Sequence, residues 1–456
     1  MSREIHGKRV LLLGYGREGQ SAHRWLVGQR HDLSIGIADR SSVTPLDDIA
    51  APDAFYCGER HLEHLLEFDT IIRSPGIPRS LPQLIAAERA GVHITSLTNI
   101  FFSTAPGKIV AVTGTKGKST TSSLIYQILR KRFSDVRLVG NIGNPVLDYL
   151  TSATDETLFV MELSSFQLED FSYHPQIAVL MRIVPEHLDH HGSFEAYRLA
   201  KLRIQQQQGA KDTLVLAEDT LDELHHLLKG SGRRVTFNTP SSSCWFDNEA
   251  LYLSVEGSRQ YLLSLSEFPL KGPGNLRNAM AAATVGVLMG VSTTDIADVL
   301  RSAKPLPHRL EYVGEFRSIR FYNDSLATIP QATLQALEGL EHVETLILGG
   351  HDRGVDLTPL VEGMMGLAKA PSVLVLLPTT GEKIWSLVCA HYPTAQSRMR
   401  AFSADSMEQA VRLAYQHTPP GSVCLLSPAS SSLNLFRDYR DRGEQFCHWV
   451  QALASS

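Results

Sequence analysis

The sequence predicts an α/β protein of about three modules, and three observations support this prediction. The chain has 456 residues, which is too many for a single domain with one hydrophobic core. Hydrophobic residues make up 43% and charged residues 20%, which excludes a disordered or fibrous chain. Short apolar runs that end in Gly, Ser or Pro alternate with helical patterns, an order typical of parallel sheets covered by helices.

The first module begins with a predicted strand at residues 9–13, a glycine turn at 14–19 and a helix. Two further apolar runs, 33–37 and 70–72, lead into polar residues. Together they predict a small doubly wound domain over residues 1–98. The turn reads Gly-x-Gly-x-x-Gly and an aspartate follows twenty residues after its last glycine, which by itself suggests a dinucleotide site for NAD.

The second module, predicted over residues 99–302, repeats the order of strand, glycine-rich loop and helix, starting at 109–113. Two apolar runs, 157–161 and 177–181, end in chemically capable residues, as expected at the carboxyl edge of a parallel sheet. Segment 243–265 predicts a small antiparallel excursion. Helices are predicted at 276–288 and 294–302.

The third module, predicted over residues 303–456, follows a linker at 304–309 that is punctuated by prolines. Its strongest strand candidates are 345–348, 372–377 and 423–426. Each leads into Gly, Pro or Ser and then a helical pattern, so this module is also predicted to be α/β.

The sharpest motif is the loop after the strand 109–113. It consists of Gly114, Thr115, Lys116, Gly117, Lys118, Ser119 and Thr120. Glycines let backbone N–H groups converge on phosphate oxygens, the lysine at 118 supplies a cation to the β- and γ-phosphates, and a hydroxyl at 119 or 120 can join a Mg²⁺ shell. A plain glycine turn with two surface lysines is the alternative. The coincidence of strand, loop, Lys-Ser pair and helix favours the phosphate site.

Candidate metal ligands follow the next two strands. Glu162 is predicted at the sheet edge that faces the phosphate loop, where a carboxylate suits Mg²⁺. His187 belongs to the run Glu-His-Leu-Asp-His-His at 186–191, and Lys201 lies on a helix that begins near Ser193. Solvated or capping histidines explain this run equally well, and its spacing does not match a zinc protease.

Composition argues against several functions. The net charge is −5, and no run of Lys or Arg is long enough to bind nucleic acid. The N-terminus lacks the apolar region of a signal peptide, and no apolar stretch reaches membrane-spanning length, so we expect a cytoplasmic protein without membrane insertion. The five cysteines are scattered without Cys-x-x-Cys spacing, which argues against a disulfide framework and a zinc site.

Together these residues resemble the Mur ligase superfamily, and within it the members that add glutamate to UDP-N-acetylmuramoyl-L-alanine. The resemblance covers nearly the whole chain. It implies a three-domain Mur ligase architecture, with a Rossmann-like UDP-binding domain, a central P-loop ATP-binding domain and a Rossmann-like C-terminal domain that binds glutamate. The segments that carry it are 114–120, 141–145, 162–169, 187–189, 200–201, 275–278, 308–309, 323–325 and 427–429.

The resemblance also implies roles for single residues. Lys118, Glu162, His187 and Lys201 would be catalytic. Two Mg²⁺ ions would be bound, one by Ser119 and Glu162 and one by His187 and Lys201, the latter often carbamylated in this family into a carboxylate-like ligand. The predicted ATP-binding residues are Gly114, Thr115, Lys116, Gly117, Lys118, Ser119, Thr120, Asn275, Asn278, Arg309 and Asp324. The predicted UDP-sugar residues are Gly16, Arg17, Asp39, Arg40, Ser74, Gly76, Asn141, Ser164 and Gln167.

The implied reaction activates a carboxylate. The alanine carboxylate of the UDP-sugar takes the γ-phosphoryl group of ATP to give an acyl-phosphate, and the amine of glutamate then displaces phosphate. The resemblance assigns the glycine turn at 14–19 to the UDP pyrophosphate, at a helix N-terminus. NAD is the alternative there, but the rest of the chain offers no plausible hydride-acceptor site.

The implied glutamate pocket departs from the common pattern. Members that add D-glutamate usually read Asn-Asp-Ser-Lys-Ala-Thr-Asn, whereas here Leu326 stands in place of the lysine. Losing an ammonium beside a dicarboxylate costs a charge-assisted contact unless another cation replaces it, and Arg353 is the candidate. The predicted pocket residues are Leu326, Thr328, Arg353, Ser432 and Tyr439.

This altered pocket resembles a less common branch that adds L-glutamate and leaves inversion to a separate epimerase. L-glutamate is therefore favoured, and D-glutamate is the alternative. Rival functions are another Mur-type amide ligase, such as a folylpolyglutamate synthase-like or cyanophycin-type enzyme, a non-catalytic nucleotide-binding regulator, and an NAD-dependent oxidoreductase. We expect a monomer that acts on small molecules, with a functional link to a glutamyl epimerase.

Overall fold

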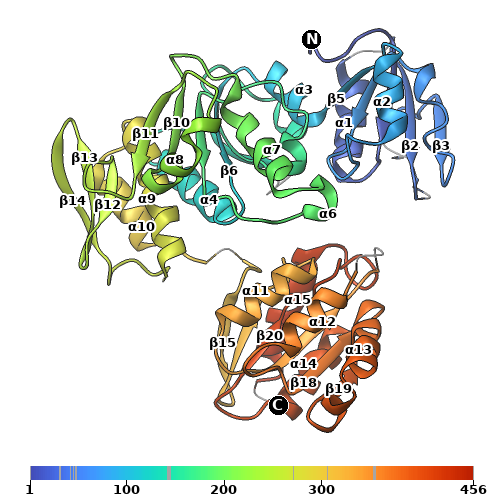
Figure 1. Ribbon diagram of the computed structural model, residues 1–456, viewed down its shortest axis with the longest axis vertical. Helices are drawn as coiled ribbons and strands as arrows, with labels where there is room; N and C mark the ends of the chain where they lie inside the picture. The colour runs from blue at the N-terminus through green and yellow to red at the C-terminus, as the bar shows by residue number, and fades with distance from the viewer. Residues whose placement is uncertain are drawn as a thin grey trace. The chain divides into compact units, whose positions relative to one another are not determined.

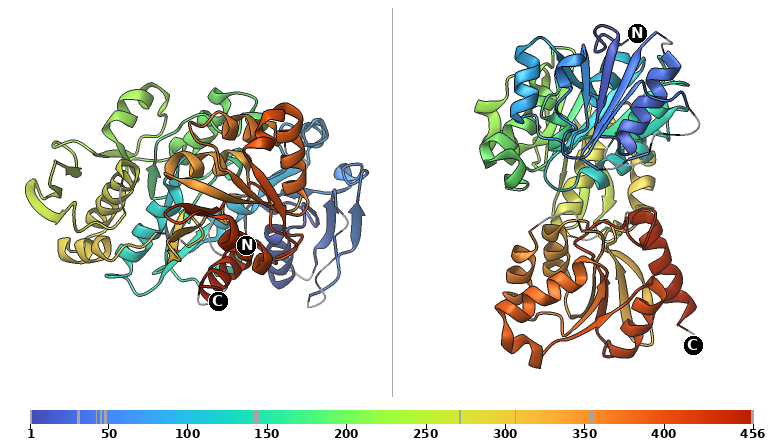
Figure 2. Two further views of the ribbon diagram at one scale, coloured as in Figure 1. Left: turned by 90° about the horizontal axis from the view of Figure 1, so that it is seen from below. Right: turned by 90° about the vertical axis from the view of Figure 1, so that its right-hand side faces the viewer.

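The computed structural model describes residues 2–29, 32–41, 43–44, 46, 49–140, 145–270, 272–305, 307–352 and 356–454. Two predicted site residues, Asn141 and Arg353, lie outside the described residues. The chain forms two compact units, Met1–Lys304 and Pro305–Ser456. Both contain parallel sheets with helices, so the predicted α/β class is confirmed (Figures 1 and 2).

The N-terminal part of the first unit is a parallel sheet with strand order β3-β2-β1-β4-β5 (Figure 1). Strand β1 is apolar and buried from Val10 to Leu13 because both of its faces are covered there. It pairs with β2 on one side and β4 on the other, so the strand order reverses beside it and leaves a crevice at the carboxyl ends. The elements are β1 (Arg9–Leu13), α1 (Arg17–Gln29), β2 (Ser34–Asp39), β3 (Ala54–Cys57), η1 (Leu65–Glu67), β4 (Thr70–Arg73), α2 (Pro82–Arg89), β5 (His93–Ser96) and α3 (Leu97–Thr104).

The central part of the first unit is a parallel sheet of order β11-β10-β9-β6-β8-β7. Strand β6 lies between β9 and β8, so the loops after these three strands meet at one edge. The elements are β6 (Lys108–Thr113), α4 (Lys118–Leu129), β7 (Val136–Gly140), η2 (Val146–Tyr149), β8 (Leu158–Glu162), α5 (Ser165–Leu168), β9 (Ile177–Leu180), α6 (Leu188–His191), α7 (Phe194–Gln206), β10 (Thr213–Ala217), α8 (Glu218–Leu224), η3 (His225–Leu227) and β11 (Arg233–Phe237).

An antiparallel sheet of order β12-β13-β14 follows and confirms the excursion predicted at 243–265. Its strands are β12 (Cys244–Phe246), β13 (Ala250–Val255) and β14 (Ser258–Ser264). Helices α9 (Pro273–Leu288) and α10 (Thr293–Arg301) close the unit, as predicted. None of the helices within the described ranges is long and apolar enough to cross a membrane.

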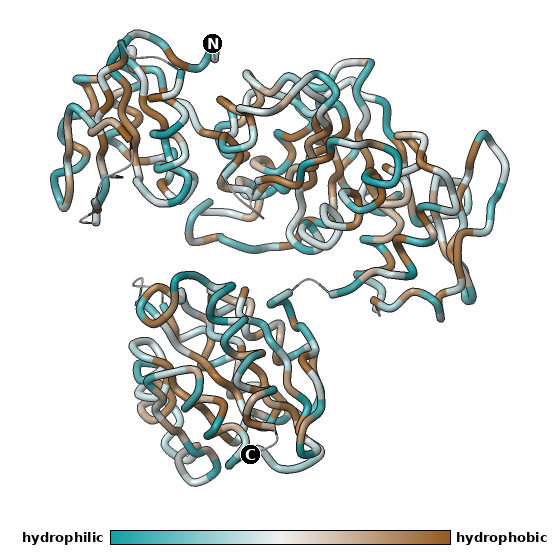
Figure 3. Tube along the Cα trace, turned by 180° about the vertical axis from the view of Figure 1, so that it is seen from behind, coloured by the Kyte–Doolittle hydropathy of each residue, from teal (hydrophilic) through white to brown (hydrophobic). Residues whose placement is uncertain are grey.

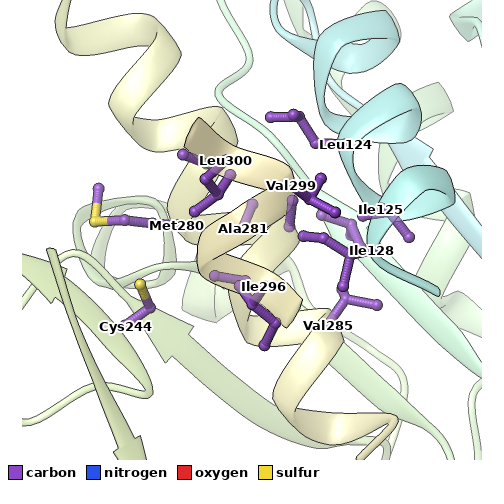
Figure 4. Close-up of a cluster of buried hydrophobic side chains, with 14 of the residues drawn as sticks. Leu124, Ile125, Ile128, Cys244, Met280, Ala281, Val285, Ile296, Val299 and Leu300 are labelled. Atoms are coloured by element: carbon purple, nitrogen blue, oxygen red, sulfur yellow. The ribbon is translucent and has the colours of Figure 1, made fainter. Parts of the chain in front are cut away.

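Two hydrophobic layers hold the central sheet. On one face, Leu124, Ile125 and Ile128 of α4 pack with Val285 of α9 and with α10 (Figure 4). Each is almost fully buried, and burial of a side chain of this size stabilises the fold by roughly 1.5–3 kcal/mol. The other layer joins central strands to the N-terminal sheet, so one continuous core connects the two parts of this unit. Figure 3 shows the hydrophobic residues along the strands inside each unit.

The second unit has one sheet of order β15-β16-β20-β17-β18-β19. All neighbouring pairs are parallel except β15 with β16. The strands predicted at 345–348, 372–377 and 423–426 are confirmed as β17, β18 and β20. The elements are β15 (Glu311–Phe316), β16 (Ile319–Asn323), α11 (Pro330–Gly339), β17 (Val343–Gly349), α12 (Thr358–Met365), β18 (Val373–Leu377), α13 (Thr380–His391), η4 (Pro393–Ser397), β19 (Arg400–Ser403), α14 (Met407–His417), β20 (Val423–Leu426) and α15 (Tyr439–Ala452).

Candidate active site

A cavity of about 860 Å³ lies at the carboxyl end of the N-terminal sheet, a volume within the usual range for small-molecule sites. Two guanidinium groups in its wall supply positive charge that suits an anionic ligand. Six of the predicted UDP-sugar residues line it: Gly16, Arg17, Asp39, Arg40, Ser74 and Gly76.

The glycine turn beneath this cavity depends on close backbone approach. Gly14 has a positive φ of 92°, and a Cβ there would lie 2.6 Å from Ser74 Oγ. A Cβ on Gly19 would lie 2.2 Å from the Gly14 carbonyl oxygen, so α1 can pack this closely only with glycine. The Asp39 carboxylate at the end of β2 accepts the Tyr15 N–H at 2.7 Å, which joins the turn to the neighbouring strand.

The phosphate loop turns from β6 into α4 at two glycines with positive φ, 148° at Gly114 and 85° at Gly117. A Cβ on Gly117 would lie 2.2 Å from Asn278 Oδ1, so α9 approaches the loop directly. Asn278 in turn donates to Asn275 Oδ1 at 3.2 Å. The structure therefore brings both predicted asparagines to the loop. The Lys118 Nζ donates to the Thr115 carbonyl at 2.9 Å, so the ammonium folds back over the loop.

The three predicted ligand positions after the phosphate loop come from separate elements of the central part. Glu162 is the last residue of β8 and is only 1% exposed. His187 precedes α6 with a φ of 55°, a left-handed backbone that is uncommon for a non-glycine residue and concentrates at functional sites. Lys201, on α7, is also 1% exposed.

The environment of Lys201 favours a neutral amine. Burial, reinforced by the positive charge of Lys118, holds the pKa of Lys201 well below its ordinary value, although Glu186 and Glu162 act in the opposite direction. Its Nζ lies 4.7 Å from the centre of the Tyr197 ring. A neutral amine is nucleophilic, which is the form required for reaction with carbon dioxide.

The donor set around the phosphate loop fits magnesium. It offers the buried Ser119 hydroxyl and the Glu162 carboxylate, which are oxygen donors of the kind that Mg²⁺ prefers, with His187 as a nitrogen donor. A carbamate on Lys201 would add a further oxygen donor. Such ions would neutralise charge on a phosphoryl group.

Two predicted UDP-sugar residues have a local structural role. Ser164 and Gln167 form a reciprocal capping box at the start of α5, with the Ser164 N–H donating to Gln167 Oε1 at 3.0 Å. Gln167 Nε2 also donates to Glu18 Oε1 at 3.3 Å. The capping box accounts for the Ser-x-x-Gln spacing, and the assignment of both residues to the sugar stays a prediction.

In the second unit, a buried arginine joins the loops that follow two neighbouring strands. Arg442 of α15 is fully buried and donates to Ser325 Oγ at 3.0 Å, to the Ser325 carbonyl at 2.9 Å and to the Ser430 carbonyl at 3.0 Å. Ser325 follows β16 and Ser430 follows β20. No local motif marks this arginine, so it was not predicted from the sequence.

Four of the predicted glutamate-pocket residues lie near these hydrogen bonds. Leu326 and Thr328 follow Ser325 in the chain, and Ser432 follows Ser430. The Tyr439 carbonyl accepts the Ser325 hydroxyl at 2.7 Å. Arg442 therefore joins the two loops that carry Leu326, Thr328 and Ser432.

Asp324, predicted to contact ATP, is nearly buried in the second unit, where Arg309 also lies. Its Oδ2 accepts the Ser427 hydroxyl at 2.8 Å and its Oδ1 accepts the Leu310 N–H at 3.1 Å. Burial raises the pKa of Asp324 to about 6, because these hydrogen bonds offset only part of the cost of an ionised carboxylate.

We expect Asp324→Asn to stabilise the protein at pH 8 but not at pH 4. The folded-state pKa exceeds the ordinary value of 3.8, so the folded protein binds the extra proton between these values and loses stability as the pH rises through them. Asparagine removes a penalty of up to about 3 kcal/mol above pH 6. Thermal unfolding midpoints at the two pH values measure the effect.

The exposed Asp356 is the matched control, because backbone and side-chain hydrogen bonds from Thr358 lower its pKa. Asp356→Asn is expected to give no gain at pH 8. Equal midpoint changes for Asp324→Asn at both pH values would contradict the assignment of a raised pKa.

Three family domains match the chain in order. The N-terminal domain of MurD-like Mur ligases matches residues 8–96, the Mur ligase middle domain matches 112–286, and the glutamate ligase domain of Mur ligases matches 308–430. The chain is similar to the UDP-N-acetylmuramoylalanine–D-glutamate ligase of Acidobacterium capsulatum, 35% identical over 98% of this chain and 97% of that protein. It is similar to the ligase of the same name from Exiguobacterium sibiricum, 32% identical over 99% and 98%.

Solved structures share the fold. The MurF ligase of Acinetobacter baumannii has a TM-score of 0.57 at 17% identity, covering 98% of this chain and 92% of that one. The murein peptide ligase Mpl of Psychrobacter arcticus has a TM-score of 0.56 at 15% identity and covers 99% of both chains. MurC of Thermotoga maritima has a TM-score of 0.55 at 18% identity, covering 98% of this chain and all of that one.

Proposed function

Because this chain belongs to the Mur ligase family and has its three-domain α/β architecture, we propose that it adds glutamate to UDP-N-acetylmuramoyl-L-alanine at the expense of ATP. The reaction would form an amide bond in a peptidoglycan precursor. One observation supports this proposal above the others. A single unit contains both a cavity with two arginines beside a glycine turn and a phosphate loop followed by Glu162, His187 and Lys201.

The proposed chemistry has two steps. A carboxylate oxygen of the alanine attacks the γ-phosphorus of ATP, ADP leaves, and an acyl-phosphate forms. The amine of glutamate then attacks the carbonyl carbon, loses a proton, and phosphate leaves as the amide forms. Lys118 would hold the γ-phosphate of ATP during phosphoryl transfer. Water would hydrolyse the acyl-phosphate, so the site must exclude it.

We propose that two Mg²⁺ ions assist, one held by Ser119 and Glu162 and the other by His187 and a carbamylated Lys201. The burial of Lys201, which lowers the pKa of its amine, supports the carbamate. The cavity lined by Arg17 and Arg40 would hold the UDP pyrophosphate. We also propose that Arg309 and Asp324 contact ATP. The boundaries between the three domains are proposed at 98/99 and 302/303.

The enantiomer of glutamate is a separate proposal. The names of the relatives include D-glutamate and favour this enantiomer, which is the alternative. Leu326 stands where D-glutamate-adding members usually have lysine, and this departure supports L-glutamate. With L-glutamate, a separate epimerase would be needed to invert the product.

We expect Leu326→Lys to lower kcat/KM for L-glutamate about tenfold. A new ammonium in the pocket would draw a substrate carboxylate to a different position through a charge-assisted contact. A tenfold loss corresponds to about 1.4 kcal/mol of lost stabilisation. Steady-state kinetics with both enantiomers measure the change. Leu66→Lys, at an exposed leucine of the first unit, is the control and should leave both enantiomers unaffected. Unchanged kinetics for both enantiomers in Leu326→Lys would remove this leucine from the pocket.

The decisive assay measures phosphate release from ATP with UDP-N-acetylmuramoyl-L-alanine and with L- or D-glutamate in parallel. We expect release only when ATP, the UDP-sugar and one glutamate enantiomer are all present. A folylpolyglutamate synthase-like or cyanophycin-type ligase would need another acceptor, a regulator would release no phosphate, and an oxidoreductase would need NAD. Absence of ATP consumption with the muramoyl substrate would overturn the proposal.

The proposed substrates also suggest where and how the protein works. ATP and UDP-linked sugars are made in the cytoplasm, so we propose a cytoplasmic enzyme. We also propose that the working form is a monomer.

A further inference from the structure

Three potential metal ligands, none of them a residue proposed for magnesium, lie together in the first unit. Glu169 is the C-cap residue that follows α5, and His190 and His191 are the last residues of α6. One donor atom from each lies within 4.8 Å of the other two. The two histidines belong to the run at 186–191 of which the proposed reaction uses only His187.

His190 has a buried ring nitrogen that could bind a cation. Its side chain is 9% exposed, and its Nε2 has no hydrogen-bond partner among the described residues. This atom lies 3.5 Å from Glu169 Oε2, too far for a good hydrogen bond. A buried polar atom left unsatisfied costs about 1–3 kcal/mol, a penalty that a bound cation would remove.

Two neighbours affect this cluster. Arg73 Nη1 lies 3.5 Å from Glu169 Oε2 and opposes a cation, but Arg73 also donates to Asp170 at 2.8 Å, so its charge is shared between two carboxylates. His191 Nε2 lies 3.1 Å from Ser165 Oγ. That contact leaves the other ring nitrogen available and orients the imidazole, as outer partners of metal-binding histidines do.

We propose that Glu169, His190 and His191 bind one divalent transition-metal cation of the zinc class. Two imidazoles and one carboxylate, with water in a fourth position, are a common zinc donor set, whereas magnesium prefers oxygen donors. Bonds near 2 Å in a tetrahedral site place the donor atoms about 3.3 Å apart, so donors up to 4.8 Å apart need to approach one another by up to about 1.5 Å. This proposal does not depend on the ligase activity.

The test is a Zn²⁺ titration of the full-length protein against a chromogenic chelator, with excess Mg²⁺ present. We expect one Zn²⁺ per chain, and affinity at least about tenfold weaker in His190→Gln and in His191→Gln. His174→Gln is the matched control, because that histidine pairs with Asp212 at 3.1 Å elsewhere in the same unit. His187→Gln distinguishes the cluster from the proposed magnesium ligands. Neither His174→Gln nor His187→Gln should weaken Zn²⁺ binding.

Thermal unfolding with and without Zn²⁺ gives a second readout that separates misfolding from lost binding. Zn²⁺ should raise the unfolding midpoint of the wild type but not that of Glu169→Gln, whose midpoint without metal shows whether it folds. Zn²⁺ binding of equal strength in the wild type and both variants at 190 and 191, or loss confined to His187→Gln, would overturn the proposal.

Discussion

Replacing Lys118 with alanine is expected to lower kcat of the proposed ligase reaction at least about a thousandfold while the fold is retained. A cation on a transferring phosphoryl group acts where charge develops, and loss of such a group has effects of this size. The fold should survive because Lys118 is the first residue of α4, where alanine is the best helix former. Within the loop, the substitution removes the hydrogen bond from the lysine ammonium to the Thr115 carbonyl.

Phosphate release and ATP binding should be measured for this variant beside Lys211→Ala, which removes an exposed lysine of the same unit. Circular dichroism checks that both variants fold. The control should keep wild-type turnover. Near-normal turnover in Lys118→Ala would show that this residue does not take part in phosphoryl transfer. The other assignments would not be affected by that result.

Replacing Lys201 with alanine is expected to abolish turnover for a different reason. The proposed carbamate supplies oxygen ligands to a metal ion, so its removal leaves His187 as the remaining protein ligand of that pair. A small carboxylate such as acetate should then partly restore activity, because it can occupy the vacated space and offer the same oxygens. Burial already disfavours a charged amine at this position, so the substitution does not break a stabilising buried ion pair.

Turnover of Lys201→Ala should be measured against rising acetate, with chloride matched for ionic strength. Lys118→Ala is the control, since acetate cannot replace a cation, and it should stay inactive throughout. Full activity of Lys201→Ala without any carboxylate would show that no carbamate is needed. Inactivity that acetate leaves unchanged would favour a role for the lysine other than that of a metal ligand.

The sequence predicted elements where a local signal was strong. The continuous apolar runs of β1, β6 and β17 mark buried parallel strands, and the phosphate loop stands between a strand and a helix as expected. Strand β15 was missed, because it is a half-exposed edge strand without an apolar run. Its antiparallel pairing with β16 depends on a neighbour and not on its own composition.

Site residues were predictable to the degree that they belong to a motif. Arg17, Asp39 and Ser74 were predicted together and line one cavity. Nothing local marks Arg442, although it joins two loops of the second unit through three hydrogen bonds. Ser164 and Gln167 were assigned to the UDP-sugar; they also form a helix capping box, and the assignment stays a prediction.

By itself, the sequence determined the α/β class, the phosphate loop and the candidate ligands, because each depends on residues close together in the chain. Glycines at 114 and 117 and the lysine at 118 act through local backbone geometry, which a short segment specifies. Only the tertiary structure decided which elements share an edge of a sheet and which side chains lose water. The burial that favours a neutral Lys201 and the cluster of Glu169 with His190 and His191 both arise from segments that meet only after folding. Electrostatics and desolvation depend on distances in space, and spacing along the chain does not contain them.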